Sequence, residues 1–105
     1  MKYKIKYQTR GSIESYIAMT TSFISELAGE TFAEHELLSV LQNIAEEVMC
    51  QADLSTKGLT AIPKWEINNG ANKSLQVYNT NGREVLIVYF DRIYDKGEGP
   101  QVKRL

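Results

Sequence analysis

Apolar and polar residues alternate strictly near the start of the chain. Tyr3, Ile5 and Tyr7 fall on one side of this pattern, and lysines at positions 2, 4 and 6 fall on the other. A period of two predicts a half-buried strand over residues 2–7. Lysines on its polar side discourage pairing with the strands of other proteins.

The spacing of apolar residues then becomes helical. Between Ser12 and Gly29 they recur at steps of three and four, which predicts a helix capped by Ser12 and ended by Gly29 in the left-handed conformation. The segment Thr31-Phe32-Ala33-Glu34 has the form of a capping box and predicts the start of a second helix, closed by Gly58. The short joint predicts an antiparallel helical hairpin.

After Gly58 β-branched and aromatic residues replace the helix formers. Trp65-Glu66-Ile67 predicts a short strand, and residues 75–80 and 83–94 predict two strands joined by Asn81-Gly82, a pair typical of a two-residue hairpin turn. We expect the first strand to join residues 83–94. The predicted fold class is α+β: a small antiparallel sheet of three to four strands with an α-helical hairpin packed on one face, in the order β-α-α-β-β-β. Residues 1–105 form a single domain, and residues 95–105 are expected to be a mobile tail.

A two-residue turn implies a strand register in which Val77 opposes Leu86 and Tyr78 opposes Val85. One face of the hairpin then carries Leu75, Val77, Leu86, Val88 and Phe90, and suits packing against the helices. The other face is also apolar and carries Tyr78, Val85, Ile87 and Tyr89. Three explanations stay open for this second face: another segment of the chain covers it, it is the interface of a homodimer, or it binds another molecule.

Charge is distributed unevenly along the chain, although the net charge is −1. Residues 11–54 contain eight carboxylates and no Lys or Arg, whereas eight of the twelve basic residues follow residue 54. An acidic helical layer of this kind complements a basic protein surface. The candidate partner-binding residues on it are Glu34, Glu36, Glu46 and Glu47.

Residues suited to catalysis are sparse. The single cysteine excludes a disulfide framework and a cysteine-based zinc site, and the single histidine leaves little for metal binding or acid–base chemistry. The seven glycines form no phosphate-binding loop. We therefore expect no enzymatic activity, no metal and no cofactor. No apolar run approaches the roughly 20 residues of a membrane-spanning helix, and the basic first residues are not followed by the apolar stretch of a signal peptide. We expect a cytoplasmic protein that does not bind membranes.

Three functions remain. The leading one is a small non-enzymatic binding protein that occupies a partner protein's basic surface, of the physical type of bacterial immunity proteins and phage inhibitors of host defence. The alternative is an RNA-binding protein or ribonuclease that uses the basic, tyrosine-rich sheet. The order of elements resembles that of the RelE-type ribonuclease toxins in topology alone, and this chain lacks their strongly basic character. A structural homodimer is the third.

Overall fold

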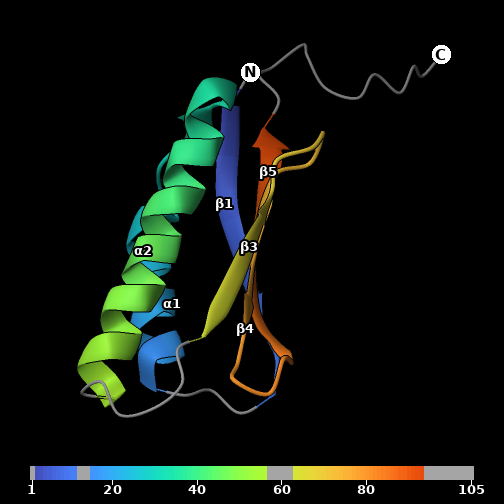
Figure 1. Cartoon of the computed structure of the whole chain (residues 1–105). Helices are drawn as coiled ribbons and strands as arrows, with labels where there is room; N and C mark the ends of the chain where they lie inside the picture. Colours follow the sequence, from blue (N-terminus) through green and yellow to red (C-terminus); the bar gives the residue numbers. More distant parts are fainter. Residues whose placement is uncertain (1, 12–14, 57–62, 94–105) are drawn as a thin grey trace, which may run out of the picture.

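The computed structural model describes residues 2–11, 15–56 and 63–93. They form a five-stranded antiparallel sheet with two α-helices on one face (Figure 1). The strands are β1 (Lys2–Thr9), β2 (Phe32–Ala33), β3 (Lys64–Asn68), β4 (Ser74–Tyr78) and β5 (Glu84–Ile93), and the helices are α1 (Ser15–Leu27) and α2 (Leu37–Thr56). The predicted α+β fold is confirmed, and the strand beyond the predicted three to four is the two-residue β2.

The strand order in the sheet is β2-β1-β5-β4-β3. β1 pairs with β5 over its whole length, from Lys2 opposite Ile93 to Thr9 opposite Leu86. The expected pairing of the first strand with the long C-terminal strand is therefore confirmed. β2 covers only the start of β1, because it pairs with Lys2 and Tyr3 alone.

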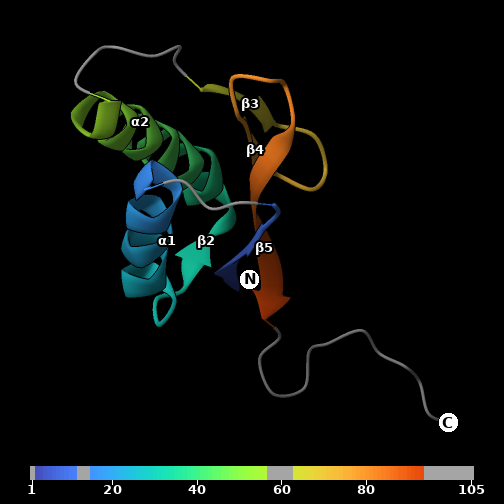
Figure 2. The same cartoon turned by 90° about the horizontal axis from the view of Figure 1, so that it is seen from below.

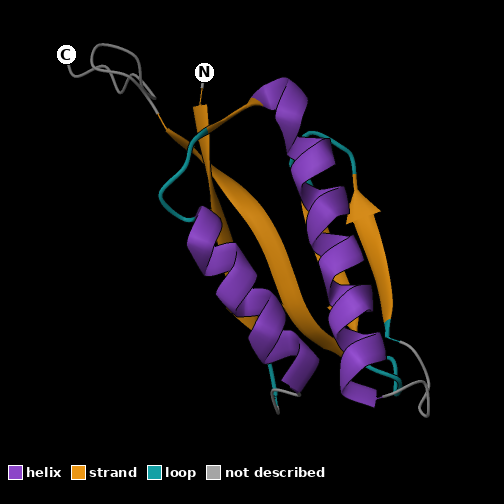
Figure 3. Cartoon of the chain, turned by 90° about the vertical axis from the view of Figure 1, so that its left-hand side faces the viewer, coloured by secondary structure: helices purple, strands orange, loops and turns teal. Residues whose placement is uncertain are grey.

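The hydrophobic core lies between the sheet and the helices, which pack together on the same face (Figures 2 and 3). The predicted apolar stripes supply it. The side chains with no or almost no exposed surface include Ile17, Ile24, Leu41, Ile44, Val48, Leu75, Val77, Leu86 and Val88. Burial of one such side chain stabilises the fold by about 1.5–3 kcal/mol. The buried hydroxyl of Thr20 donates to the Tyr16 carbonyl oxygen at 2.8 Å, so this polar group is satisfied.

The second helix begins later than the capping box predicts. Phe32 and Ala33 pair with β1 as β2, and this pairing keeps the backbone extended where the predicted helix would start. A 3-10 turn over Glu34–Glu36 follows, and the Glu36 carboxylate accepts a hydrogen bond from the Ala33 N–H at 2.7 Å. The predicted cap at Thr31 is therefore wrong by two residues, because strand pairing took precedence over the local signal.

The end of the first helix also differs from the prediction. Glycines with positive φ in the described residues are Gly11 and Gly82, and Gly29 is not among them. The chain leaves α1 instead through turns in which Ala28 and Glu30 donate to the carbonyl oxygens of Ser25 and Leu27. The expected cap at Ser12, the closure at Gly58 and the tail at 95–105 lie outside the described residues.

The β4–β5 hairpin turns over three residues rather than two. The Gly82 N–H donates to the Asn79 carbonyl oxygen at 2.9 Å, and the Asn79 N–H donates to the Arg83 carbonyl oxygen at 2.9 Å. Tyr78 therefore faces Glu84, and the predicted two-residue turn is wrong. An irregularity beside Val77 then adds one residue to β5, so Val77 still faces Leu86 as predicted.

Candidate functional site

The four carboxylates selected from the sequence differ in their exposure and in their hydrogen-bond partners. Glu46 is exposed on α2 and has no hydrogen bond or ion pair within the described residues. The Glu36 carboxylate accepts a hydrogen bond from the Ala33 N–H. Glu47 is half-buried and accepts from Gln51 Nε2 at 2.7 Å. Glu34 lies toward the sheet, where the Tyr3 hydroxyl is 3.5 Å from its Oε1.

A different set of carboxylates lies open on the helices. We define the acidic layer as Glu26 on α1, Glu30 after it, and Glu46 and Asp53 on α2, all of which are exposed. No Lys or Arg occurs between residues 11 and 54, so no basic residue of the helices can neutralise this layer. Glu26 and Asp53 each lie in the last turn of their helix, where the helix dipole disfavours negative charge by about 0.3–1 kcal/mol. Helix stability therefore does not explain the acidity.

The opposite face of the sheet is basic along β1. Ile5 is buried against the helices, so the exposed Lys2, Lys4 and Lys6 point away from them. No described element covers this outer face (Figure 2). The same face also carries carboxylates, because Asp91 lies opposite Lys4 and the charges of Glu66 and Glu84 act on Tyr78. The basic character of the outer face is therefore confined to β1.

The outer face also holds most of the apolar set expected there. Tyr78, Ile87 and Tyr89 are half-buried, and Tyr89 lies opposite Lys6. Val85 does not lie on this face as predicted, because it is 3% exposed and belongs to the hydrophobic core. The bulge in β5 interrupts the strict alternation of side chains on which the sequence prediction relied.

On this face the pKa of the Tyr78 phenol is shifted from its ordinary value. Partial burial raises the pKa of its phenol above the ordinary value of 10.0, and the negative charges of Glu66 and Glu84 raise it further. The phenol therefore stays protonated and can donate hydrogen bonds over the whole physiological pH range.

A polar cleft of about 660 Å³ opens at the end of the sheet where α2 begins. Charged groups of both signs line it, among them Glu34, Lys73, Asp91 and Arg92, together with Tyr3 and Tyr89. These residues come from four segments that are distant in the sequence, so no local pattern could have predicted the cleft. The described residues contain no group of three or more His, Cys, Asp or Glu able to hold a metal ion, and Cys50 is an exposed free thiol on α2.

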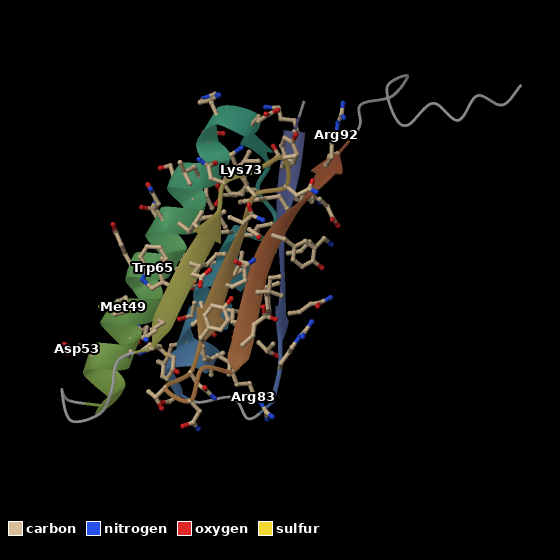
Figure 4. The ribbon with its side chains drawn as sticks, turned by 45° about the vertical axis from the view of Figure 1, so that its right-hand side comes forward. Met49, Asp53, Trp65, Lys73, Arg83 and Arg92 are labelled. Atoms are coloured by element: carbon tan, nitrogen blue, oxygen red, sulfur yellow. The ribbon has the colours of Figure 1, made fainter. Side chains whose placement is uncertain are left out.

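Trp65 is an exposed aromatic residue that the sequence placed in a strand but did not mark as a candidate site residue. It is 39% exposed and lies on the edge strand β3. Trp65 pairs with the buried Val77, which places it on the face of the sheet that carries the helices. Figure 4 shows its side chain directed from β3 toward α2 at the level of Met49, with Asp53 further along the helix. The residue type was visible in the sequence, but its place at an edge depends on the strand order.

No protein-family model, curated protein or solved structure matches this chain. None of the described helices combines the length and the apolar character needed to cross a membrane.

Proposed function

We propose that this protein is a non-enzymatic binding protein whose acidic layer docks on a basic surface of a partner protein. One observation carries the proposal: Glu26 and Asp53 occupy the last turns of α1 and α2 with no basic residue on either helix. Each of these charges opposes the helix dipole. A carboxylate that costs stability and has no partner in its own helix is explained by a cation supplied from outside.

The arrangement of charge also favours oriented binding. The helices carry carboxylates and no Lys or Arg, whereas lysines and carboxylates share the outer face of the sheet, so a basic surface attracts the helices more strongly than the sheet. Complementary charge of this kind raises the association rate and discriminates against wrong partners. Screening by salt shortens its range to about 8 Å at physiological ionic strength, so the association rate should fall steeply as salt is added.

The test is affinity capture of partners with the full chain, followed by binding kinetics on the captured protein. The substitutions Glu26→Gln and Glu46→Gln together remove one charge from each helix at exposed positions. The matched control, Glu84→Gln with Asp91→Asn, removes the same number of charges from β5. We expect Glu26→Gln with Glu46→Gln to slow association and the control pair to leave it unchanged. The control pair removes the ion pair between Arg10 and Glu84, whose side-chain atoms lie 3.5 Å apart, so circular dichroism is used to confirm that each variant is folded.

The proposal predicts that the captured protein is basic where it contacts α1 and α2. Equal association rates for the wild type and the variant Glu26→Gln with Glu46→Gln would refute it. Loss of binding in the control pair alone would also refute it, and would move the binding surface to the sheet.

A second function is favoured by the outer face of the sheet. There Lys6 lies opposite the half-buried Tyr89, which combines a cation with an aromatic ring on an uncovered strand pair, as in platforms for single-stranded RNA. Titration of a labelled single-stranded oligonucleotide, followed by fluorescence anisotropy, tests it. Binding by the wild type that is lost in Lys4→Gln with Lys6→Gln would support this second function, and no binding by the wild type at low salt would exclude it.

A further inference from the structure

Two edges of the sheet are open in the described residues. β3 is a terminal strand, and its five residues pair with β4 on one side only. On the other side, β2 covers Lys2 and Tyr3 and leaves the rest of β1 unpaired. An open edge presents a row of N–H and C=O groups that can pair with another strand.

Within the described residues neither charged side chain of β3 forms an ion pair. Lys64 and Glu66 are exposed, and β4 places the uncharged Tyr78 and Gln76 opposite them. Between them lies Trp65, 39% exposed at the same edge. Lys64 and Glu66 carry opposite charges, so two copies of this edge do not meet the like-charge repulsion that keeps a strand of one sign away from its own copy.

We propose that β3 pairs with β3 of a second copy of this chain, antiparallel and with the two-fold axis at Trp65. In this register Lys64 of one copy lies opposite Glu66 of the other, and the reverse, so two pairs of opposite charges close the interface. The two tryptophans lie opposite each other on the helix-bearing face. This surface consists of strand residues outside the acidic layer, so the proposal does not rest on the proposed function.

The other registers are less favourable on the same grounds. An axis at Glu66 places Glu66 opposite its own copy, and an axis at Lys64 places two lysines together, which is destabilising. If one copy is shifted by a single residue, N–H and C=O groups that point toward the partner strand lie opposite groups that point away from it, because the two directions alternate along a strand. Among the registers with an axis at residues 64–66, the one with its axis at Trp65 therefore places opposite charges together and aligns the backbone groups for hydrogen bonding.

The other open edge lacks this self-complementarity. If β1 paired with its own copy about Ile5, Lys4 would lie opposite Lys6 of the copy, and like charges would repel each other. β1 thus carries a like-charge repulsion against its own copy that β3 lacks. Its lysines also provide a matched control position for the experiment.

The aromatic contact adds to the pairing. Aromatic pairs across neighbouring strands are among the more favourable cross-strand contacts, and tryptophan is enriched among the residues that dominate interface energies. Only three residues of each β3 pair directly in this register, so we expect a weak dimer whose population depends on protein concentration.

The experiment is sedimentation velocity on the full chain over a concentration series, with four variants. Lys64→Glu and Glu66→Lys each place like charges opposite one another twice, and we expect the dimer to weaken about tenfold in either variant. The double variant, Lys64→Glu with Glu66→Lys, restores opposite charges and should restore the dimer. Lys6→Glu makes the same charge change on β1, where Lys6 lies opposite Tyr89 as Lys64 lies opposite Tyr78, and should leave the dimer unchanged.

Trp65 is the sole tryptophan of the chain, so its fluorescence reports on this surface directly. We expect its emission to shift to shorter wavelength as the wild type is concentrated, and not in Lys64→Glu at the same concentrations. Circular dichroism confirms that each variant is folded. A wild type that stays monomeric throughout the series, a double variant that does not recover the dimer, or a Lys6→Glu variant that weakens it equally would each overturn the proposal.

Discussion

The side chain of Asn79 is predicted to hold the β4–β5 hairpin together. Its Oδ1 accepts hydrogen bonds from the N–H groups of Asn81 and Arg83, both at 2.9 Å, while its backbone closes the turn. The substitution Asn79→Ala removes both side-chain bonds. A hydrogen bond contributes about 0.5–1.5 kcal/mol net, and because Asn79 is half-buried we expect a total loss of about 1–2 kcal/mol. For a domain of this size that lowers Tm by about 5–10 °C.

Urea denaturation followed by circular dichroism measures this loss. Asn79→Asp keeps an oxygen acceptor in the same place and should remain within about 0.5 kcal/mol of the wild type. Asn81→Ala removes an exposed side chain and should also have a small effect. If the turn had two residues, Asn81→Ala would cost more stability than Asn79→Ala, since Asn81 would then require positive φ. A larger loss for Asn81→Ala than for Asn79→Ala would refute the three-residue turn.

Three further predictions concern the helix start, the core and the outer face. Glu36→Ala should destabilise the protein by about 1 kcal/mol in thermal denaturation, since it frees the Ala33 N–H, whereas Thr31→Ala should have almost no effect because Thr31 is exposed and is not the cap. Leu86→Ala should cost about 2–5 kcal/mol in urea denaturation, because this side chain is fully buried on β5 and leaves a cavity. In an ultraviolet pH titration the phenol of Tyr78 should ionise above pH 10, since burial and nearby carboxylates raise its pKa. The free energy of unfolding should fall as pH rises through that range, because the folded protein resists the loss of this proton. Glu66→Gln should shift the ionisation of Tyr78 to lower pH.

Patterns that depend on neighbouring residues were predictable from the sequence. The alternation over residues 2–7 predicted β1, and the steps of three and four predicted the apolar faces of α1 and α2. The excess of carboxylates on the helices also follows from the sequence alone, since no Lys or Arg occurs between residues 11 and 54. These features are local, because side-chain direction repeats with the backbone period.

Tertiary structure decided where local signals compete or distant segments meet. Strand pairing of Phe32 and Ala33 displaced the predicted cap, and a bulge moved Val85 from the outer face into the core while preserving the register at Val77. The polar cleft and the open edge at Trp65 exist only because the chain folds into the order β2-β1-β5-β4-β3. Strand order follows from which faces bury the most apolar surface together, and that is a property of the whole chain rather than of any segment.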